Sequence, residues 1–380
     1  MKEHVLWNDI FRDPDLLSEL KEKYGTPVFL YSSAILEKQL TETKNALKDQ
    51  FEIYFAMKAN PNLELLKFMR EHVNGLDISS GGELKQALNA GYSANSVSFA
   101  GPAKTLKELE LAIKVGTGSI NVENVSELKR IIKLSKTLQI KSNIVVRVNP
   151  LKRYAAFPIR MGGVASQFGI DEEDIPSVIG MIKEHREDIE FRGIHVYAGT
   201  NSFDATGVAN SIKDIIKIAS VFEKEGFACH EINIGGGFGC SYYDASKEFS
   251  VEEFGSIANP IVSQYRQDIS HPVKFIVELG RFLVSSSGLY LAKVIALKET
   301  RESRFVILDG GMNHHLAASG NLGQFRRKNY LLSNLSNQDA KKIKCNVVGP
   351  LCTPIDLMGF NVELEAVSYT HLTLPTICSV

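Results

Sequence analysis

The sequence has few of the features that mark disulfide-rich, metal-binding or membrane proteins. It contains five cysteines in 380 residues, an odd number, and no two of them show the CxxC spacing of metal ligands. The amino-terminal stretch MKEHVLWNDIF lacks the apolar core of a signal peptide, and no apolar run approaches the roughly 20 residues of a membrane span. These absences predict a cytoplasmic protein with reduced thiols.

An excess of charge of either sign is also missing. The formal net charge is −1, so no global field attracts nucleic acid or an anionic membrane, and neither partner is expected. Hydrophobic residues make up 44% and charged residues 23% of the chain, as in ordinary globular proteins. A length of 380 residues exceeds one small domain and fits a large barrel with a second unit.

From residue 51 onward, short β-branched or aromatic runs alternate with longer amphipathic stretches. Such alternation is typical of parallel strands joined by helices, and eight strands favour a closed (β/α)8 TIM barrel in an α/β fold. An open doubly wound sheet is the alternative that the pattern leaves. The expected strands are 53–56, 75–78, 97–100, 119–122, 144–148, 193–197, 231–234 and 275–278.

The rhythm changes after about residue 280. Runs 289–297, 305–308 and 344–348 have the composition of strands, with no helical pattern between them, and 26–31 is also strand-like. These runs predict a β-rich second domain.

We therefore expect the barrel over residues 28–277 and a C-terminal β domain formed by 1–27 together with 278–365. The last stretch, 366–380, reads AVSYTHLTLPTICSV and has no clear element pattern. We interpret it as a non-native tail on a truncated domain. A genuine short β tail is the alternative.

Lys58 is the first candidate for chemistry, because it stands at the carboxyl end of the first barrel strand, where such barrels place reactive side chains. A single lysine is usually a solvated surface charge. Here it follows the apolar run Tyr54-Phe55-Ala56-Met57. Burial can lower the pKa of a lysine, and a neutral amine can form a Schiff base.

A glycine triplet, Gly235-Gly236-Gly237, follows the seventh strand. Successive glycines let backbone N–H groups close on a phosphate, although the same residues can form a simple turn. Arg281, at the end of the next strand, offers bidentate donors to phosphate oxygens and favours a phosphate site.

Other polar residues at turns and strand ends allow two interpretations each. Glu278 can be an ion-pair partner, or it can hold a proton on a pyridine nitrogen. His195 can be a core histidine or can lie flat on an aromatic cofactor. Cys352, in a Gly/Pro turn, can be a small buried hydrophobe or an exposed reactive thiol. The pair His314-His315 lacks a third ligand, so no metal site is expected.

Taken together, the order and spacing of YFAMKANPN, DISSGGEL, ELGR and GPLCTPID resemble the fold-type III pyridoxal-phosphate (PLP) decarboxylases. This is the diaminopimelate/ornithine/arginine decarboxylase group, whose barrel is shared with alanine racemase. The resemblance extends from about residue 25 to about residue 360. It implies PLP as cofactor, loss of the α-carboxylate of an amino-acid-like substrate through a Schiff base and a quinonoid, and a homodimer with shared active sites.

The resemblance also implies a role for each matching residue. Lys58 resembles the Schiff-base lysine, and Asp77 the acidic residue beside it. His195 resembles the residue that stacks on the cofactor ring, and Glu278 the partner of the pyridine nitrogen. Cys352 resembles the cysteine that the neighbouring subunit contributes to protonate Cα. The implied phosphate-binding residues are Gly235, Gly236, Gly237, Thr200 and Arg281.

Three positions depart from the family pattern. Leu279 stands where proline is usual, and HVYAGT lacks the usual serine three residues after His195, so Thr200 is expected to make that phosphate contact. Most important, Cys352 is followed by Thr353 rather than by the acidic residue that meets the distal end of a basic substrate. A buried distal ammonium would lose a charged partner, which disfavours a free basic amino acid.

The segments DGGMNHHLAASGN and GPLCTPID are most similar to two subgroups. One is linked to exosortase and surface-polysaccharide loci, and the other decarboxylates a glutamyl group tethered to an acyl carrier protein. Diaminopimelate decarboxylation is the first alternative. A racemase, which favours arginine at the pyridine nitrogen and a tyrosine base, and a non-catalytic binding homologue are the others. The family's carboxyl-terminal Gly-Ala-Tyr segment is not found, so the chain is expected to lack part of the cofactor pocket.

Overall fold

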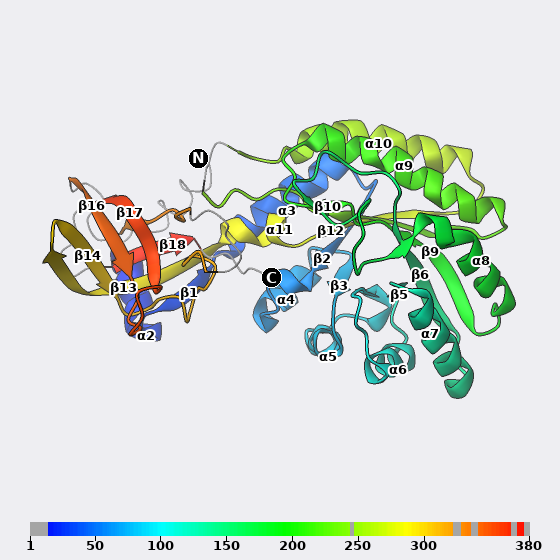
Figure 1. The fold of residues 1–380 in the computed structure, drawn as a ribbon, viewed down its shortest axis with the longest axis horizontal. Coiled ribbons are helices and arrows are strands. Elements are labelled where there is room, and N and C mark those ends of the chain that lie inside the picture. The colour runs from blue at the N-terminus through cyan, green and yellow to red at the C-terminus, as the bar shows by residue number, and fades with distance from the viewer. Residues whose placement is uncertain (1–13, 244–246, 322–327, 336–340, 366–370, 376–380) are drawn as a thin grey trace. The chain divides into compact units, whose positions relative to one another are not determined.

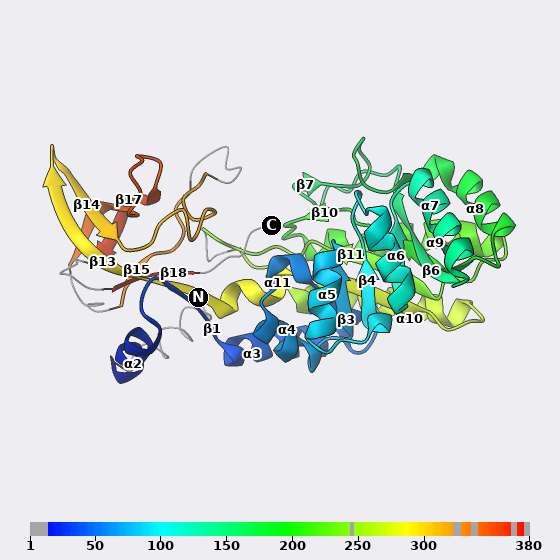
Figure 2. The ribbon, with the colours of Figure 1, turned by 90° about the horizontal axis from the view of Figure 1, so that it is seen from below.

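The structure is a computed structural model that describes residues 14–243, 247–321, 328–335, 341–365 and 371–375. Two compact units make up the chain (Figures 1 and 2). The barrel unit comprises Gln39–Gly239 and Glu248–Phe282, and the β unit comprises Met1–Lys38, Cys240–Lys247 and Leu283–Val380. The division predicted from the sequence, with boundaries at 28–277, 1–27 with 278–365, and 366–380, stays a prediction.

The barrel is a closed ring of eight parallel strands. Pairing of β5 with β6 closes the ring, so the predicted (β/α)8 barrel is confirmed and the open sheet is wrong. The strands are almost entirely buried, as expected for parallel strands covered by helices. They are β2 (Glu52–Ala56), β3 (Gly75–Ile78), β4 (Val97–Phe99), β5 (Ser119–Val122), β6 (Ser142–Asn149), β9 (Ile189–His195), β11 (Glu231–Gly236) and β12 (Lys274–Leu279).

Amphipathic helices cover the outside of this ring (Figure 1). Their starts are set by polar caps: Asn62, Ser80, Thr105 and Asn124 each accept a hydrogen bond from a first-turn N–H. The helices are α3 (Ser33–Leu47), α4 (Leu63–Arg70), α5 (Gly81–Asn89), α6 (Leu106–Val115), α7 (Val125–Leu138), α8 (Ile175–Glu184), α9 (Ala205–Lys224), α10 (Val251–Asp268) and the short α11 (Arg281–Val284). Among the described helices, none combines the length and apolar character that crossing a membrane requires.

The β unit contains a curled, mostly antiparallel sheet around its own apolar core, which confirms the predicted β-rich domain. Its long central strand β13 pairs with β1, β14 and β18, and Tyr290, Val306 and Val347 are fully buried in the core. The unit also contains α2 (Pro14–Tyr24). Its strands are β1 (Val28–Tyr31), β13 (Gly288–Thr300), β14 (Ser303–Leu308), β15 (Ser333–Asn334), β16 (Lys342–Val348), β17 (Leu357–Glu365) and β18 (His371–Pro375).

The tail from residue 366 onward contains a strand, which the sequence allowed only as the alternative of a short β tail. Strand β18 pairs antiparallel with β13 and with β15. Backbone pairing needs no side-chain pattern, which explains why the sequence of this stretch gave no signal. The non-native origin of the tail stays a prediction.

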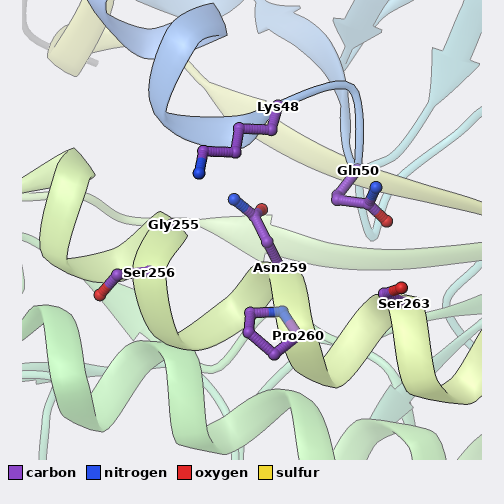
Figure 3. A pocket seen from close by; sticks show the side chains of 7 residues that line it. All are labelled: Lys48, Gln50, Gly255, Ser256, Asn259, Pro260 and Ser263. Atoms are coloured by element: carbon purple, nitrogen blue, oxygen red, sulfur yellow. The ribbon is translucent and has the colours of Figure 1, made fainter.

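A small pocket of about 260 Å³ lies between the turn after α3 and helix α10 (Figure 3). Gln50 precedes strand β2, whereas Lys58 follows it, so the pocket stands at the opposite end of that strand from the candidate active site. It is lined by Lys48, Gln50, Gly255, Ser256, Asn259, Pro260 and Ser263.

Candidate active site

Polar residues gather at the carboxyl ends of neighbouring barrel strands because parallel strands end at the same rim. Lys58 lies in a short 3-10 helix, Met57–Ala59, directly after β2, and Asp77 lies near the end of the adjacent β3. His195 ends β9 and is in register with Asn233 on β11. Glu278 is near the end of β12.

Lys58 forms an ion pair with Asp77. Its Nζ lies 3.2 Å from Oδ2 of Asp77, whose side chain is 1% exposed, while the Lys58 side chain is 38% exposed. The Asp77 carboxylate raises the pKa of the Lys58 ammonium above its ordinary value, against the opposing effect of burial. Burial does lower this pKa, as expected, but the net shift is upward because the attraction to Asp77 outweighs desolvation.

Glu278 is buried and bonded to Asn233. The Asn233 amide Nδ2 donates to Oε1 of Glu278 at 2.6 Å, and its own Oδ1 accepts from the N–H of Gly235. Burial, and then the neighbouring Asp77 charge, raise the pKa of Glu278 to about 8. Sequence reasoning missed Asn233, although a polar residue in the apolar strand EINI just before three glycines was an available signal.

His195 is 1% exposed, and neither ring nitrogen has a hydrogen-bond partner among the described residues. Its Nε2 lies 3.4 Å from Oε2 of Glu278, but without hydrogen-bond alignment. Burial, followed by the nearby Arg147 charge, lowers the pKa of His195 well below its usual range. The imidazole is therefore neutral and presents an uncharged ring.

The glycine triplet is required by close backbone packing as well as by backbone angle. Gly235 and Gly237 have φ values of +67° and +82°, and a Cβ on Gly236 would lie 1.8 Å from the carbonyl oxygen of Glu278. A Cβ on Gly237 would lie 3.0 Å from Cα of Thr200. Arg281 Nη2 donates to Thr200 Oγ1 at 3.0 Å, so the predicted phosphate residues lie together.

A buried ionic network, which the sequence did not indicate, supports this rim. Glu123 Oε1 accepts from Arg147 at 2.6 Å and from the N–H of Gly101, and its Oε2 accepts from the N–H of Gly169. Arg147 is in register with His195 on the adjacent strand. Glu123 therefore joins three segments near the site: the residues after β4, strand β6, and the residue before β8 (Ile170–Asp171). The position of Glu123 directly after β5 could have suggested that it lies at the rim, but the sequence could not have shown its three hydrogen-bond partners.

Cys352 belongs to the β unit and is not among the residues that the barrel brings together. It is an exposed free thiol in the turn between β16 and β17. Of the histidine pair, His314 is exposed, whereas His315 is buried and its Nδ1 accepts from the N–H of Ala318, a structural contact. Within the described ranges, no group of three His, Cys, Asp or Glu residues is arranged to hold a metal ion.

Comparison with known proteins decides the family. The model of the pyridoxal-binding domain of pyridoxal-dependent decarboxylases matches residues 33–285, a range that contains the whole barrel unit. The chain belongs to this family. It is a pyridoxal-phosphate-dependent decarboxylase, as the resemblance of its motifs implied.

Several relatives cover nearly the whole chain. The L-glutamyl-[BtrI acyl-carrier protein] decarboxylase of Niallia circulans is 33% identical over 92% of this chain and 82% of that protein. The diaminopimelate decarboxylase of Zymomonas mobilis is 29% identical over 94% of this chain and 83% of that protein. The crystal structure of Helicobacter pylori diaminopimelate decarboxylase with L-lysine has a TM-score of 0.84 at 26% identity, covering 94% of this chain and 88% of that chain.

The residues at the barrel rim fit pyridoxal phosphate. A buried neutral imidazole, a buried carboxylate and a lysine ion-paired to an aspartate suit a pyridine ring that bears an aldehyde. Glycine backbone beside Arg281 and Thr200 suits a phosphate. When bound, the cofactor accepts the electron pair left behind as the bond from Cα to the carboxylate breaks.

Proposed function

We propose that this decarboxylase acts on an amino-acyl group without a distal ammonium, and that a glutamyl group tethered to a carrier protein is its substrate. The observation behind the proposal is the turn that bears Cys352. Thr353 follows the cysteine, and the one acidic residue of the turn, Asp356, is 2% exposed with both carboxylate oxygens bonded to backbone N–H groups. No carboxylate of this turn is available to pair with an ammonium.

The relative with 33% identity supports the same substrate class, since its name describes an L-glutamyl group on an acyl carrier protein. Diaminopimelate is the second candidate. It is favoured by the several diaminopimelate decarboxylases that match over about nine-tenths of the chain.

In the barrel, each site residue has a proposed part. Lys58 would hold the cofactor by condensation of its amine with the cofactor's aldehyde, which releases one water, and Asp77 would keep the Lys58 Nζ in place. Glu278 holds the proton of the pyridine nitrogen, since its raised pKa disfavours an unshared buried charge. The neutral His195 ring would stack on the cofactor ring. Gly235, Gly236, Gly237, Thr200 and Arg281 bind the phosphate.

Cys352 is proposed to deliver a proton to Cα in the active site of a second copy of the chain. The residues beside it support such an interface, because Leu351 and Ile355 are 37% and 52% exposed although both are large and apolar. A homodimer would cover them. The free thiols of Cys229, Cys240, Cys345 and Cys352 agree with a cytoplasmic location.

A carbon-dioxide release screen tests the substrate. The purified protein loaded with PLP is given L-glutamyl-acyl-carrier protein, free L-glutamate, meso-diaminopimelate, L-ornithine and L-lysine at matched concentrations. We expect the largest kcat/KM for the tethered glutamyl group. Faster turnover of diaminopimelate or ornithine would overturn the proposal.

A further inference from the structure

Asp356 joins two segments of the β unit that are about 40 residues apart. Its Oδ1 accepts from the N–H of Met312 at 2.6 Å, and its Oδ2 accepts from the N–H of Leu351 at 2.9 Å. Its backbone carbonyl also accepts from the N–H of Gly349 at 3.0 Å. A buried carboxylate with these donors fixes the start of the Cys352 turn against the segment that contains Met312.

Two glycines make room for this carboxylate. A Cβ on Gly311 would lie 2.3 Å from Oδ1 of Asp356, and a Cβ on Gly349 would lie 2.3 Å from Oδ2. Neither glycine has a positive φ, so space rather than backbone angle requires them. The glycines of the motifs DGGMN and GPLC are thus explained by one side chain that lies between them.

Asn321 joins the same segments from a second point. Its Nδ2 lies 2.9 Å from the carbonyl oxygen of Ile355 and 3.6 Å from Sδ of Met312. The Cys352 turn is therefore held at its beginning, through Leu351, and near its end, through Ile355. Cys352 lies between these two points and is exposed.

We propose that Asp356 is a positioning residue that sets the orientation of the Cys352 thiol by fixing its turn on segment 310–321. The inference rests on the proposed function, which gives Cys352 the delivery of a proton to Cα. A thiol displaced by ~1 Å can reduce the rate of such a step by about 100-fold, because proton transfer needs close approach. Asp356 touches neither the substrate nor the cofactor in this proposal.

Hydrogen–deuterium exchange of the PLP-loaded protein tests the structural step. Asp356→Asn keeps the shape of the side chain but turns an N–H toward one of the two backbone donors. We expect the amides of Met312 and Leu351 to exchange about tenfold faster or more, while barrel peptides do not change. Val306→Ala, a buried core substitution in β14, is the control for general loosening of the unit. Unchanged exchange in peptides 310–314 and 349–353 of Asp356→Asn would overturn the inference.

A double-mutant cycle tests the functional step, with kcat and KM measured on L-glutamyl-acyl-carrier protein and on meso-diaminopimelate. We expect Asp356→Asn to lower kcat by about 10- to 100-fold with KM changed by less than about twofold, and Gly349→Ala to do the same. If Asp356 acts through Cys352, adding Asp356→Asn to Cys352→Ala causes no further loss. Independent, multiplying losses would overturn the inference. A Cys352→Ala protein with wild-type kcat would instead remove the proposed role of Cys352, whereas the exchange result would still decide whether Asp356 fixes the turn.

Discussion

The barrel rim and the Cys352 turn position their functional groups by different physical means. At the rim, Lys58, Asp77 and Glu278 lie close together because parallel strands end at one edge, and their charges then act on one another. In the turn, there is no strand register to fix Cys352. Its place depends on Asp356 and Asn321, which bond to backbone groups of two segments.

Amino-acid substitutions at the barrel rim and in the Cys352 turn should have different effects. A change at the rim alters the charge and pKa of neighbouring groups, because low-dielectric surroundings couple ionisable side chains. A change in the turn alters geometry without altering the charges of the barrel. Substitutions at the rim should therefore change the affinity for the cofactor and the pH dependence of kcat/KM. Substitutions in the turn should change kcat or the preference among substrates.

The largest effect is expected at Lys58. Lys58→Ala removes the amine that bonds the cofactor, so we expect loss of the visible absorbance of the bound cofactor and a decrease in kcat/KM of at least ~1,000-fold. Absorbance spectroscopy and carbon-dioxide release measure the two. Lys67→Ala, at an exposed ion pair on α4, is the matched control and should be normal. An unchanged spectrum in Lys58→Ala would exclude the assignment.

Glu278→Gln tests whether catalysis at the rim depends on the charge of Glu278. The amide retains a hydrogen bond to Asn233 but cannot hold the pyridine proton, so we expect kcat to fall by about 100-fold.

The same substitution should increase the folding stability at high pH, although it lowers kcat. Because the folded state raises the pKa of Glu278 from 4.5 to about 8, the folded protein binds more protons than the unfolded chain between these values. The wild-type carboxyl therefore contributes stability below about pH 4.5 that is lost as the pH rises toward 8.

Thermal unfolding of the protein without PLP checks the direction of this pH-dependent change in stability. Glu278→Gln should stabilise the protein at pH 8 relative to wild type and should have little effect at pH 4.5. A larger stabilisation at the lower pH would mean that Glu278 is charged throughout and that burial does not control its pKa.

The same contrast explains what the sequence could predict. All eight barrel strands and the rim residues Lys58, His195 and Glu278 follow from hydrophobic period and from the rule that strand ends bear chemistry. The direction of the Lys58 pKa shift did not follow, because it depends on its 3.2 Å distance to Asp77. Glu123 with its three donors likewise depends on which segments meet in space.

In the β unit, the sequence predicted β1, β13, β14 and β16, but neither β15, β17 and β18 nor the contacts between the connections of the strands. GPLCTPID and DGGMNHH were recognisable as motifs, yet nothing in either shows that Asp356 reaches the N–H of Met312. Side-chain bonds to backbone across about 40 residues follow no periodic pattern, so they become visible only in the folded chain.

Thr353→Glu tests the turn through substrate choice. Restoring an acidic residue after Cys352 should raise kcat/KM for meso-diaminopimelate by about tenfold, because a carboxylate attracts the distal ammonium. It should lower kcat/KM for the tethered glutamyl group, because the neutral acyl carbon through which that group is tethered cannot compensate a buried carboxylate. Thr353→Gln, similar in size but uncharged, should do neither. Equal activity of both variants on both substrates would show that this position does not meet the distal end of the substrate.

The smallest effect is expected at Asn233, which acts on the rim only through Glu278 and the glycine backbone. Asn233→Ala removes a hydrogen bond that favours the charged carboxylate, so the pKa of Glu278 should rise further. The acidic limb of the kcat/KM profile should then move to higher pH, with a decrease at the optimum of about three- to tenfold. Asn121→Ala is the matched control, because Asn121 is fully buried but bonds Ser98 rather than Glu278. If both variants keep the wild-type pH profile, the charge of Glu278 does not limit the reaction. The rim would then not act through the charges of its residues, and it would not differ from the Cys352 turn in this respect.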